Sequence, residues 1–155
     1  MRRLLIVLAL TVCVPAQACG SFSLKHRLAS KLFSDTDMRL FVCGSDKCST
    51  DKFYHGLKFR AYSESFRGGP LNICLVDPIK IARNSYTGVF AGLRGNLHFQ
   101  LISFGTGVEV GHDVGGVPVL TEHDAYDPST GHQSGAVYVW NGAGFVFEMD
   151  IDADH

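Results

Sequence analysis

The sequence contains no lysine or arginine after Arg94, although the chain has 14 of these residues. Residues 95–155 carry nine carboxylates, so this half has a net charge of about −9 with neutral histidines. Residues 19–94 carry twelve basic and six acidic side chains, a net charge of +6. Either the halves of a dipolar domain attract each other, or an acidic face attracts a basic partner or a cation. The basic side chains are scattered rather than gathered into a stripe with aromatic residues, which excludes nucleic acid as a partner.

Several enzyme motifs are also absent. There is no G-x-S-x-G nucleophile elbow, no H-E-x-x-H metal motif and no D-x-[DN]-x-[DN]-G calcium loop. No N-x-[ST] glycosylation site occurs, which fits a bacterial envelope protein. These absences favour a protein that is not an enzyme, and nothing in the sequence indicates a cofactor.

One apolar run stands out, and it lies at the N-terminus. Met1-Arg2-Arg3 is followed by the apolar run Leu4–Val14 and by Ala16-Gln17-Ala18. A basic start, a short apolar run and an A-x-A site predict a secretory signal peptide over 1–18. The run is shorter than the roughly 20 residues of a transmembrane helix, and no later stretch qualifies. We therefore expect one domain, 19–155, in the periplasm or secreted.

The cysteines point to the same compartment. Outside the predicted signal peptide they form an even set of four: Cys19, Cys43, Cys48 and Cys74. An even number in an oxidising compartment predicts two disulfides, for which three pairings exist. Cys43 and Cys48 bracket a short polar loop, so we favour a local bridge there and Cys19–Cys74 as the second. Lipidation of Cys19 is the alternative, but Ala16 stands where a lipoprotein signal usually has leucine, and one thiol would be left unpaired.

The pattern after the leader predicts a mainly β, α+β fold with an N-terminal helix. Leucines 24, 28 and 32 recur every four residues over 23–35, with Ser23 as the expected N-cap. Asn141-Gly142 predicts a tight hairpin turn with positive φ. Leu97, Phe99, Leu101 and Ser103 are expected on one strand face. Strands are expected at 38–44, 56–62, 71–77, 96–104, 107–111, 116–124, 136–142 and 144–149. An antiparallel meander of strands, which is either blade-like or forms a small barrel, satisfies this pattern.

Histidines and carboxylates are concentrated between Gly111 and His132. If 103–111 and 116–124 form a hairpin with Val110 roughly opposite Val117, its tip carries His112 and Asp113. His123 then lies about 20 Å from the tip, too far to share an ion with His112.

A second turn, 123–132, holds the remaining group: His123, Asp124, Asp127 and His132. Asp127-Pro128 followed by Ser, Thr and Gly is typical of a structural turn. The alternatives are a weak cation site, or a catalytic metal held by His123, Asp127 and His132.

The C-terminal half resembles secreted bacterial blade-like β-modules. The matching stretch runs from Leu97 to Glu148, as "LHFQLISFGTGVEVG", "GGVPVLTEHD" and "GHQSGAVYVWNGAGFVFE", with "YVWNGAGF" as its best piece. Similar segments occur in envelope proteins, including immunity proteins that inhibit peptidoglycan-cleaving toxins. The Asp-rich calcium loops of some such modules are absent here. The resemblance implies a binding module.

We therefore expect a non-enzymatic extracytoplasmic binding protein, an inhibitor or immunity factor for a basic cell-wall hydrolase. The expected contact residues are His112, Asp113, Asp124, Tyr126, Asp127 and His132. Tyr138 and Trp140 are expected to pack in the sheet. The alternatives are the metal-dependent hydrolase described above and a structural envelope protein.

Overall fold

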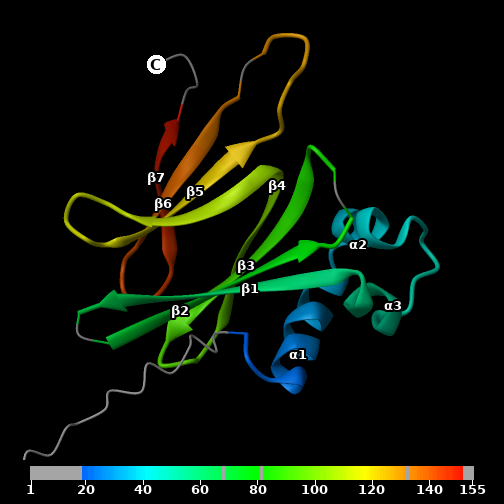
Figure 1. Cartoon of the computed structure of the whole chain (residues 1–155), viewed down its shortest axis with the longest axis horizontal. Helices are drawn as coiled ribbons and strands as arrows, with labels where there is room; N and C mark the ends of the chain where they lie inside the picture. Colours follow the sequence, from blue (N-terminus) through cyan, green and yellow to red (C-terminus); the bar gives the residue numbers. More distant parts are fainter. Residues whose placement is uncertain (1–18, 68, 81, 132, 152–155) are drawn as a thin grey trace, which may run out of the picture.

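A computed structural model of the chain describes residues 19–67, 69–80, 82–131 and 133–151. Three helices precede seven strands within these residues (Figure 1). Their bounds are α1 (Phe22–Phe33), α2 (Thr36–Cys43), α3 (Thr50–His55), β1 (Leu57–Phe66), β2 (Gly69–Pro78), β3 (Ser85–Leu93), β4 (His98–His112), β5 (Pro118–Asp124), β6 (Gly135–Trp140) and β7 (Phe145–Ile151). The predicted signal peptide and His132 lie outside the described residues.

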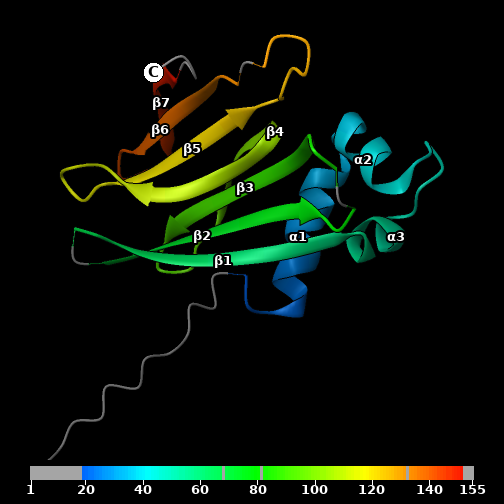
Figure 2. The same ribbon diagram turned by 45° about the horizontal axis from the view of Figure 1, so that its top comes forward.

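The strands form one open antiparallel sheet in which each strand pairs with the next one along the chain. Figure 2 shows this order rising from β1 to β7, with the helices beside the β1–β3 end. The predicted N-terminal helix and antiparallel meander are confirmed. Because spatial order follows sequence order, residues that are close in the sequence remain in the same part of the sheet.

Helix α1 packs its leucine stripe against the sheet. It begins after Ser21, whose Oγ accepts a hydrogen bond from the Leu24 N–H, so the predicted N-cap at Ser23 is wrong by two residues. Leu32 is fully buried, and a Cβ on Gly88 of β3 would lie 2.6 Å from its Cδ2. Glycine at position 88 therefore lets the helix approach the sheet.

The predicted strand at 38–44 is instead helix α2. Asp35 caps the helix by accepting from the Met38 N–H, and Gly44 ends it with φ of 70°. Met38 is fully buried on one side of this helix. Local capping outweighs the strand-like composition of Leu40-Phe41-Val42. The short helix α3 was not predicted.

Residues 85–93 form β3, which was also not predicted. The two segments expected at 96–104 and 107–111 are one continuous strand, β4. Its ladder shifts at Gln100, since Phe99 pairs with Phe90 while Leu101 pairs with Val89, and again near Thr106. Such bulges bend a strand and reverse the alternation of its side chains.

The expected single apolar face on 97–103 is therefore wrong. Leu97 packs in the helix-side core, whereas Leu101 packs in the core on the opposite face. Phe99 stays on the helix side, in edge-to-face contact with Phe90. The extra residue, Gln100, separates the residues that face the helix-side core from those that face the opposite core.

Two apolar cores lie on opposite faces of the sheet. The helix-side core combines residues of the three helices with side chains of β1–β4, and none of its described members comes from β5–β7. The other core joins Leu71, Ile73 and Leu75 of β2 to Leu120 of β5 and Trp140 of β6. The helices thus cover only the first part of the sheet, and the second core is enclosed by the curl of the sheet itself.

Contacts between distant strands show this curl. The His112 Nε2 atom of β4 lies 2.8 Å from the Glu64 Oε2 atom of β1. The Phe145 N–H of β7 donates to the Gln100 Oε1 atom of β4 at 3.0 Å. The β6–β7 hairpin was predicted correctly, but Gly142 has positive φ and Asn141 does not; the Asn141 side chain accepts from two backbone N–H groups instead.

Both predicted disulfides are present. Cys19–Cys74 joins the segment that precedes α1 to the fully buried centre of β2, and Cys43–Cys48 closes the loop between α2 and α3. Because the Cys19 sulfur is bonded to Cys74, it is not available for a thioether-linked lipid in this structure. No helix among the described residues has the length and apolar character needed to span a membrane.

Candidate functional site

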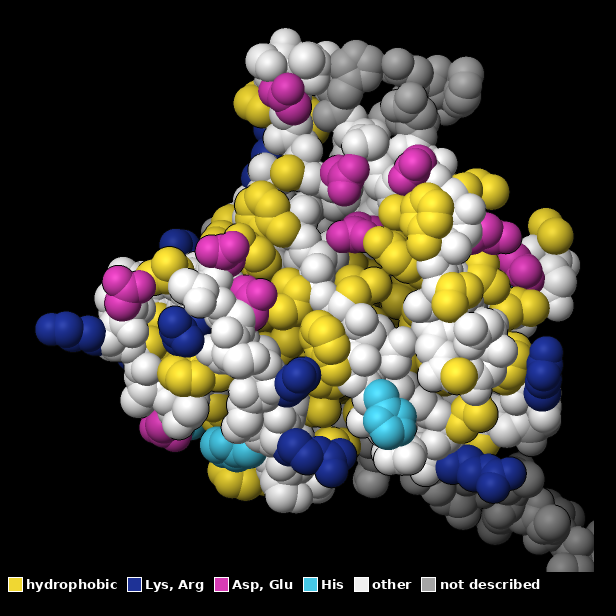
Figure 3. All heavy atoms as spheres, turned by 180° about the vertical axis from the view of Figure 1, so that it is seen from behind, with side chains coloured by type: hydrophobic (Ala, Val, Ile, Leu, Met, Phe, Trp, Pro, Cys, Tyr) yellow, Lys and Arg dark blue, Asp and Glu magenta, His cyan; other side chains and the backbone are white. Residues whose placement is uncertain are grey.

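The charge asymmetry of the sequence becomes an asymmetry in space. Because the strands are ordered β1 to β7, the acidic half forms β4–β7 and the basic half forms the helices with β1–β3. Figure 3 shows many acidic side chains in the upper part of the molecule, with apolar side chains between them, while basic ones lie mainly lower in the view. An acidic surface therefore occupies one part of the molecule.

The basic half does not neutralise this surface by direct ion pairs. Across the described ranges, Arg60–Asp77 is the one pair that joins Lys or Arg to a carboxylate within 4.0 Å, and both residues belong to the N-terminal half. The other close pairs of opposite polarity involve histidine. Within the described residues, the carboxylates of the acidic half therefore have no Lys or Arg of the basic half in direct ion-pair contact.

The β4–β5 hairpin positions His112 and Asp113. The hairpin exists as predicted, but its register differs: Val110 pairs with Leu120, and His112 with Pro118. His112 is thus the last residue of β4 rather than part of the tip, and its imidazole contacts Glu64. Asp113 Oδ1 accepts from the N–H groups of Gly115 and Val117, both at 2.8 Å, so this carboxylate shapes the turn.

His123 lies at the other end of β5, beside Gly107 of β4. Its Nε2 atom is 3.7 Å from Oε1 of Glu109, a side chain that is 77% exposed. His112 and His123 therefore contact different carboxylates and do not meet.

The loop after β5 holds Asp124, Tyr126 and Asp127. Asp124 accepts from the Ser134 hydroxyl at 2.6 Å. The Tyr126 ring stacks under the Arg83 guanidinium at 3.6 Å, which attaches this loop to the β2–β3 loop. The tyrosine remains partly exposed.

Asp127 forms the turn that the sequence indicated. Its Oδ1 accepts from the Ser129 hydroxyl and N–H at 2.7 and 2.8 Å, and its carbonyl accepts from the Gly131 N–H. The hydrogen bonds from Ser129 to the carboxylate, the one from its hydroxyl first, lower the pKa of Asp127 below its usual range. The carboxylate is ionised and exposed, as a contact surface for a cation or a basic side chain requires.

The three proposed metal ligands are not brought together as far as the structure describes them. No group of three His, Cys, Asp or Glu side chains within the described ranges has metal-binding geometry. His123 contacts Glu109 and Asp127 contacts its own turn, while His132 lies outside those ranges. The hydrolase alternative has no support in this geometry.

Tyr138 and Trp140 do pack in the sheet. Trp140 is buried in the second core, and Tyr138 packs against its edge. The Tyr138 hydroxyl donates to Glu122 Oε2 at 2.9 Å. Burial, followed by this hydrogen bond and the Glu122 charge, raises the pKa of Tyr138 from its ordinary value of about 10 to about 12.

Strand β7 adds exposed apolar side chains to the acidic surface. Val146, Phe147 and Met149 are 45%, 56% and 54% exposed, and Glu148 and Asp150 lie next to them on the same strand. Phe147 pairs with Tyr138, whereas Val146 and Met149 pair with Val139 and Val137, so Phe147 lies on the other face of β7. The ladder to β6 is irregular between Phe147 and Met149. A bulge of this kind hinders the addition of a further strand at the edge of a sheet.

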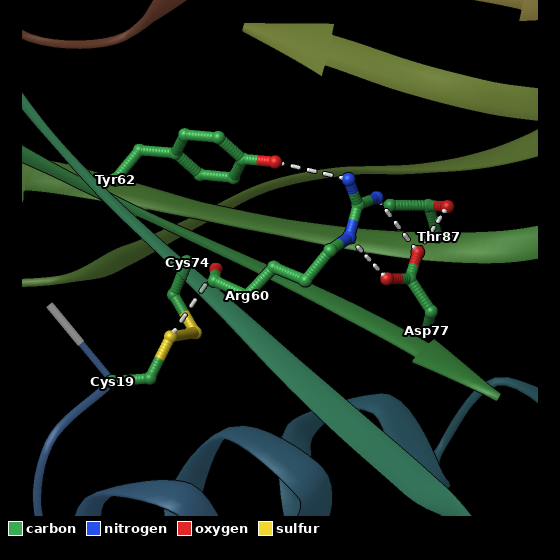
Figure 4. Close-up of polar contacts among 6 residues, drawn as sticks. All are labelled: Cys19, Arg60, Tyr62, Cys74, Asp77 and Thr87. Carbon is green, nitrogen blue, oxygen red and sulfur yellow. Dashed lines mark hydrogen bonds and ion pairs between the residues drawn. A yellow bond between two sulfur atoms is a disulfide. The ribbon is translucent and has the colours of Figure 1, made fainter. Parts of the chain in front are cut away.

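A second polar site, centred on Arg60 of β1, was not predicted. Arg60 Nε donates to Asp77 Oδ2 at 2.7 Å and Nη2 donates to Oδ1 at 3.2 Å (Figure 4). Thr87 donates to the same carboxylate at 2.8 Å, and Arg60 Nη1 donates to the Tyr62 hydroxyl at 3.0 Å. Chiefly through the hydrogen bond to Asp77, the pKa of Arg60 is raised above its ordinary value.

Two adjoining cavities meet at Arg60. One, of about 410 Å³, is also lined by Thr106, Gly107, Glu109 and His123. The other, of about 200 Å³, is lined by Lys58 and Lys80 among others, and shares Arg60, Thr106 and Gly107 with the first. We call the two together the Arg60 cleft. No sequence motif indicated this cleft, because strand register, and not a fixed spacing along the chain, brings Arg60 to Asp77.

The comparisons with known proteins do not assign this site. Searches against protein-family models, curated proteins and solved structures each found no match. The resemblance to blade-like β-modules therefore remains a hypothesis from the sequence, and the function must be argued from the geometry of the chain.

Proposed function

We propose that this protein is a non-enzymatic, extracytoplasmic binding protein whose acidic β4–β7 half binds a basic protein. The observation that carries the proposal is the segregated acidic surface, which no described Lys or Arg of the other half neutralises by direct contact. Like-signed surface charge attracts partners of opposite charge and speeds their association.

The contact surface combines charge with apolar area. Asp124 and Asp127 lie in the loop after β5, and Glu148 and Asp150 lie on β7 beside exposed Phe147. Protein interfaces typically combine aromatic and apolar anchors with a polar rim. A partner with a basic surface and an apolar depression would fit it.

Two disulfides in a small domain support a location outside the cytoplasm, because such bridges persist in oxidising compartments. Basic proteins that act there include cell-wall hydrolases. The role we propose is therefore inhibition of, or immunity to, a basic peptidoglycan-cleaving enzyme, with periplasmic or secreted localisation.

The proposal is tested by capture of basic proteins from a bacterial envelope extract, followed by calorimetry with the purified partner. Asp124→Asn/Asp127→Asn retains the acceptor oxygens that Ser134 and Ser129 use but removes two charges. We expect it to weaken binding roughly three- to tenfold, since rim charges are worth about 0.2–1 kcal/mol each. The matched control, Asp46→Asn/Asp51→Asn, removes two exposed charges of the basic half and should leave affinity unchanged.

Inhibition gives the second readout. The captured hydrolase should lose peptidoglycan-cleaving activity when the wild-type protein is added in equimolar amount. Failure to capture any basic envelope protein, or equal effects of the test and control pairs, would contradict the proposal.

A further inference from the structure

The inner face of β1 is unusual because it carries charge where its neighbours carry apolar side chains. Lys58, Arg60 and Tyr62 alternate onto the face that β2 fills with Ile73 and Leu75. Desolvating an arginine is unfavourable unless its donors are satisfied. A packed apolar pair would hold the strands equally well, so Arg60 and Asp77 require another explanation.

The Arg60 guanidinium is fixed in position but remains accessible. Asp77, which is 8% exposed, holds it through two hydrogen bonds and is itself held by Thr87. The Arg60 side chain is still 38% exposed. Of its five N–H donors, three are used within the described residues, so Nη1 and Nη2 each retain one there.

The smaller cavity is electropositive. Lys58, Arg60 and Lys80 line it with Asp77 as its single carboxylate, so its lining has a net charge of +2. Lys58 is exposed and makes no ion pair among the described residues, while the Lys80 ammonium lies 5.2 Å from the Phe41 ring centroid. Ser85, Thr87 and Thr106 also line this cavity.

We propose that the Arg60 cleft binds an oxyanion, the carboxylate or phosphate group of a small ligand, through the two remaining N–H groups of Arg60 and the ammonium of Lys58. A preorganised guanidinium suits planar carboxylate and tetrahedral phosphate oxygens, and its hydrogen bonds to anions are about twice as strong as neutral ones. The cationic residues of the site belong to the basic half, Thr106 and Gly107 of β4 line both cavities, and the site does not depend on the acidic contact residues proposed above.

Titration of the full mature chain with acetate or inorganic phosphate, followed by amide NMR shifts at constant ionic strength, tests this inference. Chloride, added as sodium chloride, is the reference anion. We expect saturable shifts at Thr87, Thr106 and Gly107 with at least one oxyanion, and the stronger binder identifies the ligand group. Shifts that match those in chloride, or that never saturate, would overturn the proposal.

Variants separate the site from general surface charge. Arg60→Lys keeps a positive charge for Asp77 but removes the fork, and should weaken oxyanion binding about tenfold. Lys58→Gln changes an exposed side chain and should weaken it about threefold without affecting folding. Lys47→Gln, an equal charge change outside the cleft, should have no effect. Equal effects of the Lys58 and Lys47 variants would refute a site at Arg60.

Discussion

Arg60 and Asp77 illustrate how one residue pair can depend on the whole sheet. They lie 17 residues apart, and only the β1–β2 register brings the guanidinium to the carboxylate at 2.7 Å. Asp77 is almost fully buried, so the loss of Arg60 would leave a desolvated carboxylate. Removing one partner of the pair should therefore cost more stability than the intact pair contributes to the fold.

Arg60→Gln should lower the free energy of unfolding by about 2 kcal/mol, because Asp77 would keep its hydrogen bond from Thr87 but lose its counter-charge. Urea denaturation measures this. Glu109→Gln, which removes the exposed partner of His123, should cost less than about 0.5 kcal/mol. Equal costs for the two substitutions would show that burial of Asp77 has no role.

Tyr138 gives a pH dependence with a definite sign. Its pKa is raised to about 12 in the folded chain, so the fold favours the neutral hydroxyl that donates to Glu122. This contribution is complete below the unfolded pKa of about 10 and is lost as the pH rises through 12. Stability should therefore fall on the alkaline side.

Tyr138→Phe should be less stable than wild type by about 1 kcal/mol at neutral pH, and the difference should shrink toward about pH 12. Denaturation midpoints at several alkaline pH values measure it. Tyr54→Phe is the control, since its hydroxyl has no hydrogen bond among the described residues. A constant difference across this range would show that the hydrogen bond to Glu122 does not shift the ionisation of Tyr138.

At the scale of elements, the two disulfides should contribute unequally. Cys19–Cys74 spans 55 residues and Cys43–Cys48 spans five. Loop-closure entropy assigns about 4 kcal/mol to the first and about 2 kcal/mol to the second. Paired serine variants of each bridge, compared by thermal unfolding, should show the larger loss of stability for Cys19→Ser/Cys74→Ser. The reverse order would mean that local strain, not chain entropy, decides their contributions.

The elements also show which structures the sequence can predict. Strong alternation and turn residues correctly placed most of β1, β2 and β4–β7. Strand β3 was missed because Gly88 and Gly92 interrupt its apolar pattern, yet Gly88 is needed for α1 to approach. The helix at 36–43 was missed because its apolar run resembles a strand, although Asp35 caps it.

The candidate sites also include features that local sequence predicts and features that only strand pairing creates. Turn chemistry at Asp113 and Asp127 could be predicted from local sequence, because their carboxylates bond to backbone two to four residues away. The contacts of His112 with Glu64 and of Arg60 with Asp77 could not be predicted. The Arg60–Asp77 contact depends on the β1–β2 register. The His112–Glu64 contact joins β4 to β1 across the curl of the sheet, and β4 carries two bulges that no local pattern reveals.

At the scale of the molecule, the meander converts the uneven distribution of charge along the sequence into an uneven distribution of charge on the surface. Sheets that mix distant strands would have interleaved the basic and acidic segments. Here strand order equals sequence order, so the carboxylates of β4–β7 stay together, and the neighbouring strand β3 carries no Lys or Arg. The acidic face is thus a consequence of topology as much as of composition.

The salt dependence of partner binding tests this account most directly. Affinity for the captured basic protein should fall steeply between about 50 and about 300 mM NaCl. Asp127→Asn/Glu148→Gln/Asp150→Asn should flatten that dependence and lower the low-salt affinity, whereas Asp37→Asn/Asp46→Asn/Asp51→Asn, with the same change in net charge, should leave both unchanged. Equal salt slopes for the wild type and the two triple variants would contradict an acidic binding face on β4–β7.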